Sequence, residues 1–279
     1  MLISFSQMLK TAHETGYAVG SFNVYNYETM RGACEAAKEL NMPLIVSFGA
    51  KYLENMTLQE AVSMARTLSE VMGFDFCLHL DHCSNMDTVY AAIRAGFSSV
   101  MYDGSMLPFE ENLANTAAVC RVAHACGVSV EAELGSLAAT DTSHEGSASD
   151  REVYTDPELA ERFVKETGVD ALAVSVGTVH GLYKGTPKIR QDILKDINAK
   201  TGIPLVMHGG SGIPEEMIKE SIRNGISKIN VNTEIATYTV AKTAELISGE
   251  KKPHLAVVAC KQQVWVKEVV QKYMRFFAL

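Results

Sequence analysis

Three histidines each follow an apolar run typical of a buried strand. His82 comes after Cys77-Leu78-His79-Leu80-Asp81 and His208 after Pro204-Leu205-Val206-Met207, while His180 lies five residues beyond Ala171-Leu172-Ala173-Val174-Ser175. A single histidine near a strand end is more often a structural hydrogen-bonding residue. Three imidazoles from three separate strand ends suit a catalytic zinc site, in which three protein ligands leave a fourth position open. The histidines therefore predict a metal site.

Asp81 precedes His82 directly. Neighbouring residues of a strand face opposite sides, so both side chains can serve one site only if the chain bends there. We expect Asp81 to share a face with His79 and His82 to lie past the strand end. A carboxylate beside a bound cation could accept or return a substrate proton; a solvated Asp-His turn is the alternative.

Further acids end two other strand-like runs. Asp103 ends the fourth, and Glu131 and Glu133 end the fifth. Carboxylates close to histidine ligands commonly fix the orientation of the imidazole. We expect this role for Asp103 and Glu133, with a surface charge as the alternative.

Two turns predict a phosphate site. Gly209-Gly210-Ser211-Gly212 and Asn230-Val231-Asn232-Thr233 follow the seventh and eighth strands, and each leads into a helix. Backbone N–H groups at such turns bind anions, and barrels use these two loops for phosphate. A tight turn would also use these glycines. Lys184 is a candidate cationic contact or an exposed lysine.

A metal ion and a phosphate anchor together indicate chemistry at a carbonyl next to a phosphorylated arm. The metal would act as a Lewis acid that stabilises an enediolate. A Schiff-base mechanism would need a lysine at a strand end facing the pocket. Lys228 lies too deep in the eighth strand for that role.

Strand-like and helix-like segments alternate along the chain. We predict strands over 18–24, 43–48, 76–81, 98–102, 129–134, 171–175, 204–208 and 227–231. We predict helices over 27–39, 58–72, 86–95, 109–125, 157–166, 189–200 and 215–224, with Pro214 opening the last. Eight near-continuous apolar strands predict a (β/α)₈ barrel, because polar residues gather at many consecutive strand ends. A doubly wound sheet is the rival architecture.

Composition limits the classes of protein. The 279 residues carry a net charge of −8, which argues against non-specific nucleic-acid binding. We read neither a signal peptide nor an apolar run long enough to span a membrane. Six cysteines without a Cys-x-x-Cys pair suit a reducing cytoplasm. We expect a single domain over 1–279, in which the polar segment 136–156 is a mobile lid over the active site.

The sequence resembles the class II, zinc-dependent fructose- or tagatose-bisphosphate aldolases over essentially its whole length. The matching stretches are Ser21-Phe22-Asn23-Val24, His79-Leu80-Asp81-His82, Tyr102-Asp103-Gly104-Ser105, Leu107-Pro108-Phe109-Glu110-Glu111-Asn112, Val130-Glu131-Ala132-Glu133-Leu134-Gly135, Val176-Gly177-Thr178-Val179-His180-Gly181-Leu182-Tyr183-Lys184-Gly185, His208-Gly209-Gly210-Ser211-Gly212-Ile213-Pro214 and Lys228-Ile229-Asn230-Val231-Asn232-Thr233-Glu234.

The resemblance implies roles for these residues. His82, His180 and His208 would bind zinc, Asp81 would exchange a proton with the substrate hydroxyl, and Glu133 would lie near the metal. Dihydroxyacetone phosphate would be held by Gly181, Gly209, Gly210, Ser211, Asn230, Val231, Asn232 and Thr233. Asn23, Ser47 and Lys184 are further candidate substrate-binding residues. A monovalent cation, Na⁺ or K⁺, accompanies the phosphate site in the family. We expect a homodimer or a homotetramer.

Three segments depart from the family pattern. Cys83 stands where relatives usually have glycine. The lid begins Ser136-Leu137-Ala138-Ala139-Thr140-Asp141, so the match to the family's proton-exchanging glutamate is the shorter Asp141, or else the role passes to Glu145. The segment Ser47-Phe48-Gly49-Ala50-Lys51 matches only loosely. A sugar-phosphate-binding relative without turnover and a metal-dependent sugar-phosphate epimerase are therefore the alternatives to an aldolase.

Overall fold

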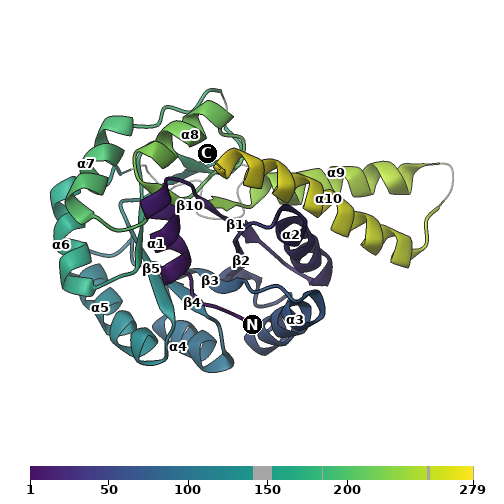
Figure 1. The fold of residues 1–279 in the computed structure, drawn as a ribbon, viewed down its shortest axis with the longest axis horizontal. Helices are drawn as coiled ribbons and strands as arrows, with labels where there is room; N and C mark the ends of the chain where they lie inside the picture. Colours follow the sequence, from purple (N-terminus) through teal and green to yellow (C-terminus); the bar gives the residue numbers. More distant parts are fainter. Residues whose placement is uncertain (141–152, 184, 250–251, 279) are drawn as a thin grey trace.

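A closed barrel of eight parallel strands forms the centre of the molecule (Figure 1). The computed structural model describes residues 1–140, 153–183, 185–249 and 252–278. Around the barrel the strands follow the order β1-β10-β9-β7-β5-β4-β3-β2. Their bounds are β1 (Val19–Asn23), β2 (Leu44–Gly49), β3 (Cys77–Cys83), β4 (Ser99–Tyr102), β5 (Ser129–Leu134), β7 (Ala171–Val174), β9 (Leu205–Met207) and β10 (Ile226–Val231). The predicted (β/α)₈ fold is confirmed, and the doubly wound sheet is wrong.

Seven helices match the predicted helical segments. They are α2 (Tyr27–Leu40), α3 (Leu58–Met72), α4 (Met86–Ala95), α5 (Phe109–Ala125), α6 (Pro157–Thr167), α7 (Gln191–Thr201) and α8 (Glu215–Arg223). Local signals set several ends: the capping box at Asn26 starts α2, and Gly96, in the left-handed region with φ 109°, ends α4. Pro214 was expected to open α8 as its first residue, but it is the N-cap and the helix begins at Glu215.

Several elements were not predicted. The helices α1 (Ser6–Thr15) and α10 (Leu255–Phe277) lie at the two ends of the chain, and α9 (Thr233–Ser248) continues well beyond the helical start expected after the eighth strand. A 3₁₀ turn, η1 (Ala50–Tyr52), follows β2. The short strands β6 (Ala138–Ala139) and β8 (Val179–His180) pair with each other outside the barrel.

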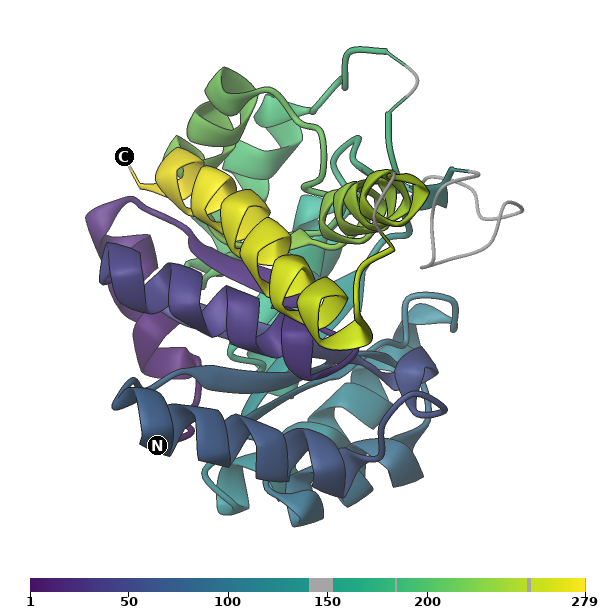
Figure 2. The same cartoon turned by 90° about the vertical axis from the view of Figure 1, so that its right-hand side faces the viewer.

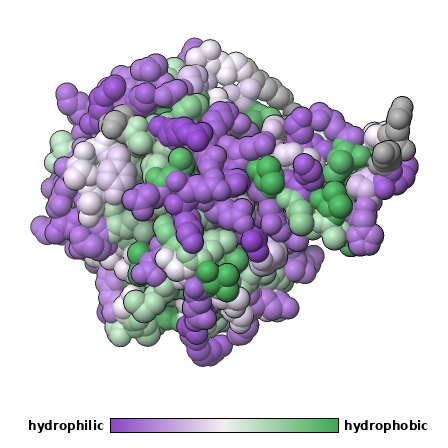
Figure 3. All heavy atoms as spheres, turned by 45° about the vertical axis from the view of Figure 1, so that its right-hand side comes forward, coloured by the Kyte–Doolittle hydropathy of each residue, from purple (hydrophilic) through white to green (hydrophobic). Residues whose placement is uncertain are grey.

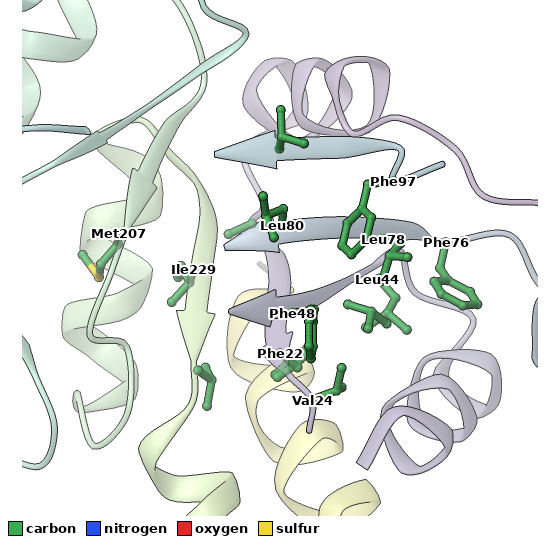
Figure 4. Packing of buried hydrophobic residues seen from close by; sticks show 14 of the residues in the cluster. Phe22, Val24, Leu44, Phe48, Phe76, Leu78, Leu80, Phe97, Met207 and Ile229 are labelled. Atoms are coloured by element: carbon green, nitrogen blue, oxygen red, sulfur yellow. The ribbon is translucent and has the colours of Figure 1, made fainter. Parts of the chain in front are cut away.

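The strands are buried on both faces. Their outward side chains, among them Phe22, Phe48, Leu80 and Ile229, pack against the surrounding helices (Figure 4). At the amino-terminal end the interior is apolar, because Phe5, Leu9 and Ala12 from the α1 region pack with Val19, Ile45, Cys77, Ala171, Ala173 and Val206. Above this apolar layer the interior becomes polar, and that polar layer supports the site.

Helices α9 and α10 lie together and extend away from the barrel (Figures 1 and 2). α10 approaches α2 closely at Gly32, where an added Cβ would lie 2.6 Å from the carbonyl oxygen of Gln263. The projecting part carries exposed apolar side chains (Figure 3), including Val240, Ile247 and Leu255. No helix in the described ranges combines the length and apolarity needed to cross a membrane.

Candidate active site

A bulge in β3 places Asp81 and His82 on the same side of the strand. The register advances three residues from Leu80 to Cys83, while β4 advances two from Val100 to Tyr102. His82 occupies the extra position and has a positive φ of 43°, which is uncommon for a residue other than glycine. The expectation that His82 lies past the strand end is therefore wrong, since β3 continues to Cys83. The bend that a shared site required is present inside the strand.

The three predicted histidines lie together at the carboxyl end of the barrel. Their ring centroids are separated by 5.0 Å for His82 and His180, 4.5 Å for His82 and His208, and 5.9 Å for His180 and His208. One ring nitrogen from each can be chosen so that all three lie within 4.8 Å of one another. This spacing lets one ion contact all three imidazoles.

His180 and His208 are brought together by the turn after β9. The backbone N–H of Thr140 donates to the carbonyl oxygen of His180 at 2.8 Å, and this bond connects the start of the predicted lid to β8. Gly209 has φ 68°, and a Cβ there would lie 2.1 Å from the carbonyl oxygen of Val179. Only glycine permits this approach, because it has no Cβ and tolerates a positive φ.

Each histidine has a buried nitrogen that makes no hydrogen bond among the described residues. These atoms are Nε2 of His82, Nε2 of His180 and Nδ1 of His208. A buried polar atom without a partner is costly, so each such atom calls for an explanation. Three neutral imidazole nitrogens are a typical donor set for catalytic zinc. The residues present therefore fit a zinc ion.

Carboxylates hold the opposite nitrogens of two of these rings. Oδ2 of Asp103 lies 2.9 Å from Nδ1 of His82, and Oε1 of Glu131 lies 2.9 Å from Nε2 of His208. Oε2 of Glu133 lies 3.4 Å from Nδ1 of His208. Asp103 and Glu133 thus lie where the sequence placed them, beside the histidines. Glu131 was recognised as a strand-end acid but was not assigned to the site.

The electrostatics of the three imidazoles differ. Burial lowers the pKa of His82, but the hydrogen bond that His82 donates to Asp103 and the charge of Asp81 outweigh burial and raise the pKa well above its usual value. Burial and the charge of His82 lower the pKa of His208, yet its hydrogen bond to Glu131 and the nearby carboxylate of Glu133 outweigh them and raise that pKa to about 9. Burial, reinforced by His82 and His208, lowers the pKa of His180 well below normal.

Asp81 is fully buried and held by two amides. Asn23 Nδ2 donates to Oδ2 at 2.8 Å, and Asn230 Nδ2 donates to Oδ1 at 3.2 Å. Burial raises the pKa of Asp81, but the charges of His82 and Lys228 outweigh it, so the pKa is lowered. Asp81 is therefore an oriented carboxylate next to His82, which suits a group that accepts a proton.

A small pocket adjoins the histidines. It is lined by His180, Gly181, Gly209, Ser211, Asn230, Asn232 and Thr233. Most of the predicted phosphate residues are thus brought together, beside the start of α9 at Thr233. In the part of the chain that the structure describes, Gly210 and Val231 do not line it: Val231 is in the core, and Gly210 packs on β10. Lys184, Asp141 and Glu145 lie outside the described residues.

The remaining predicted residue, Ser47, lies lower in the barrel, where its Oγ is 2.5 Å from Oγ of Ser21. Sequence reasoning missed Tyr25 and Tyr52, whose rings meet edge to face with centroids 4.9 Å apart. Both hydroxyls contact Asn232, a residue of the pocket. Tyr25 follows the Asn23 motif and Tyr52 follows Lys51, so their positions next to matched segments were the available signal. Cys83 is buried and its thiol donates to the carbonyl of Asn85.

Comparisons with known proteins agree with this arrangement. A family model described as fructose-bisphosphate aldolase class-II matches residues 3–279. A probable fructose-bisphosphate aldolase of Bacillus subtilis is 44% identical over 238 residues, covering 84% of this chain and 82% of that protein. A fructose-bisphosphate aldolase of Staphylococcus aureus is 41% identical over 256 residues, covering 90% and 88%.

Solved structures show the same likeness. The YdjI aldolase of Escherichia coli K12 superposes with a TM-score of 0.88 at 31% identity, covering 100% of this chain and 98% of that chain. A putative fructose-1,6-bisphosphate aldolase of Coccidioides immitis gives a TM-score of 0.89 at 26% identity, covering 97% and 94%. With its barrel, its histidine cluster and a family match along nearly the whole sequence, this chain belongs to the class II fructose-bisphosphate aldolase family.

Proposed function

We propose that this chain is a zinc-dependent aldolase that reversibly cleaves a phosphorylated ketose, of the fructose- or tagatose-1,6-bisphosphate type, to dihydroxyacetone phosphate and an aldehyde. Family membership makes it an aldehyde-lyase that acts on a phosphorylated ketose. The observation that carries the assignment of the metal is the set of three buried imidazole nitrogens that have no hydrogen-bond partner in the described part of the chain. His82, His180 and His208 would hold the ion, and bound zinc would supply Lewis-acid polarisation of the ketose carbonyl.

Asp81 is the proposed acid–base group. In the cleavage direction its carboxylate takes the proton from the hydroxyl on the carbon that becomes the aldehyde, and the adjacent carbon–carbon bond breaks. The electron pair stays on the dihydroxyacetone phosphate fragment as an enediolate, which then gains a proton at carbon. Asn23 and Asn230 hold both oxygens of Asp81 and so orient it for this transfer.

The pocket between the turns is the proposed phosphate site. Gly181, Gly209, Ser211, Asn230, Asn232 and Thr233 line it, and α9 begins at Thr233 in its wall, so the pocket lies at a helix amino terminus of the kind that binds anions. Lys184 is proposed to add a cationic contact, Gly210 and Val231 to shape the loops, and a Na⁺ or K⁺ ion to accompany the phosphate. Ser47 is proposed to serve the far end of the substrate.

The segment 136–156 is the proposed lid of this single domain. It would bring Asp141, or alternatively Glu145, to the enediolate to exchange the proton at carbon. Ser136 and Val153, near the two ends of this segment, pair with each other through hydrogen bonds of 3.0 Å. We further propose that the protein forms a homodimer or a homotetramer, since the exposed apolar side chains on α9 and α10 suit an interface between subunits. We also propose that it is cytoplasmic.

Metal analysis and a coupled assay test the proposal together. We expect one zinc per chain and release of dihydroxyacetone phosphate when ketose bisphosphates are screened, and a chelator should abolish that release. A sugar-phosphate-binding relative would show affinity without turnover. An epimerase would turn over its substrate without releasing a triose phosphate, and either result would refute the aldolase assignment.

A further inference from the structure

Lys228 is a lysine buried inside the barrel that the chemistry above does not use. It lies on β10, its side chain is fully buried, and its ammonium points into the polar layer beneath the histidines. Its Nζ lies 2.8 Å from Oε2 of Glu131 and 2.6 Å from Oδ1 of Asn230. Fully buried lysines are rare unless paired, because removing the charge from water is costly.

One branch from Lys228 leads to a proposed metal ligand. Lys228 binds Oε2 of Glu131, and the other oxygen of that carboxylate accepts from Nε2 of His208 at 2.9 Å. With Nε2 occupied, the nitrogen of His208 left without a hydrogen bond among the described residues is Nδ1. The position of the Glu131 carboxylate therefore decides which nitrogen His208 presents.

The second branch leads to the proposed acid–base group. Asn230 accepts from Lys228 through Oδ1, so its amide nitrogen is turned toward Asp81 and donates to Oδ1 of that residue. If the Asn230 amide were flipped, its oxygen would face a carboxylate oxygen of Asp81, and its NH₂ group would face the ammonium of Lys228. A single ammonium thus sets the orientation of the amide that orients Asp81.

We propose that Lys228 is a positioning residue that couples the metal ligand His208 to the acid–base group Asp81, through Glu131 on one side and Asn230 on the other. The inference rests on the proposed function and deepens it. Both carboxylates, Glu131 and Asp81, are fully buried, and among the described side chains Lys228 is the one buried lysine or arginine that compensates them. His79, whose Nε2 lies 3.6 Å from Glu131 and 3.9 Å from Asp81, lies between the two carboxylates.

Two variants separate the branches. Lys228→Met keeps the length of the side chain but removes the ion pair to Glu131 and the hydrogen bond to Asn230, and it leaves Glu131 as an uncompensated buried charge. The double variant Lys228→Met/Glu131→Gln removes that charge and still offers His208 an amide oxygen. Neither variant supplies a donor to Asn230. Lys219→Met is the matched control, because Lys219 pairs with Glu215 on the surface of α8.

The measurements are the zinc dissociation constant, by competition with a chromophoric chelator, and kcat and KM at saturating zinc. We expect Lys228→Met to bind zinc about 10- to 100-fold more weakly, as for other changes around a ligand. The double variant should regain most of the zinc affinity, while its kcat at saturating zinc stays at least about tenfold low with KM little changed. A residue that only stabilised the fold would not produce this split.

The proposal is overturned if Lys228→Met binds zinc and turns over like Lys219→Met, or if the double variant restores both quantities or neither. Should Lys228→Met fail to fold, the charge-balanced double variant alone decides through its zinc affinity and kcat. His208→Ala distinguishes a failure of the proposed function from a failure of the role proposed for Lys228. If His208→Ala keeps zinc, the proposed function fails; if it loses zinc while Lys228→Met behaves like the control, only the role of Lys228 fails.

Discussion

Oδ2 of Asp103 lies 2.9 Å from Nδ1 of His82, and the same carboxylate accepts from the backbone N–H and the hydroxyl of Ser105 through Oδ1. Burial raises the pKa of Asp103, but the hydrogen bonds with His82 and Ser105 and the charge of His82 together outweigh burial and hold that pKa well below its usual range. Nε2, the other nitrogen of His82, is buried and makes no hydrogen bond among the described residues, so it is the nitrogen left for a metal ion.

Asp103→Asn should weaken zinc binding by about 10- to 100-fold without unfolding the barrel, because the neutral amide holds the His82 ring less firmly. A chelator competition measures the affinity. Asp170→Asn is the matched control, since Asp170 lies 2.8 Å from the exposed ring of His124. Equal zinc affinity in the two variants would show that Asp103 does not orient a ligand.

His82, His180 and His208 are expected to bind one zinc jointly. Replacing any one with alanine should remove most activity and lower the metal content, while circular dichroism shows a folded barrel. His124→Ala, on the surface of α5, should leave both quantities unchanged. If one of these three alanine variants kept stoichiometric zinc and the turnover of the parent protein, that histidine would not be a zinc ligand.

Asp81→Asn should retain zinc yet lose roughly two to four orders of magnitude in rate, the usual span for a positioned acid–base group. The change keeps the shape of the side chain but removes its ability to accept a proton. Metal content and kcat are measured on the same preparation. Loss of zinc in this variant would instead make Asp81 a ligand or a structural residue.

Gly210→Ala should weaken the binding of dihydroxyacetone phosphate about tenfold or more. An added Cβ would lie 2.5 Å from Cγ2 of Ile229 and 2.7 Å from the carbonyl oxygen of Asn230. Such overpacking costs about 1–3 kcal/mol and would force the two loops of the phosphate pocket apart. Titration calorimetry measures the affinity, and Gly249→Ala, which meets only ordinary contacts, is the control. Unchanged affinity together with a lost aldehyde preference would reverse the proposed substrate orientation.

Asp141→Ala should strongly slow proton exchange between dihydroxyacetone phosphate and solvent, while zinc and phosphate binding remain intact. This exchange isolates the proton transfer at carbon from the chemistry of the aldehyde. Nuclear magnetic resonance in deuterated solvent follows it, with Glu145→Ala as the paired variant. If exchange survives in Asp141→Ala and fails in Glu145→Ala, the role belongs to Glu145; if both exchange normally, the base lies elsewhere.

The sequence by itself determined the strands, most of the helices and the residues at the strand ends. Apolar runs, glycine C-caps and N-cap residues act within a few neighbours, so their patterns can be read directly. The helices α1 and α10 were not predicted from such local patterns. Their apolar faces contact elements far away in the chain, because α1 packs against the interior of the barrel and α10 packs on α2. The family resemblance likewise rested on local motifs.

Only the tertiary structure determined the side-chain orientations and the hydrogen bonds within the site. The bulge that turns His82 beside Asp81 depends on the register between β3 and β4. The choice of nitrogen on His82 and His208, and the links of Lys228 to Glu131 and Asn230, depend on strands that meet only when the barrel closes. Gly210 looked like a phosphate contact in the sequence, but it packs on β10. Hydrogen bonds between residues distant in the chain are set by barrel geometry, and no local pattern encodes them.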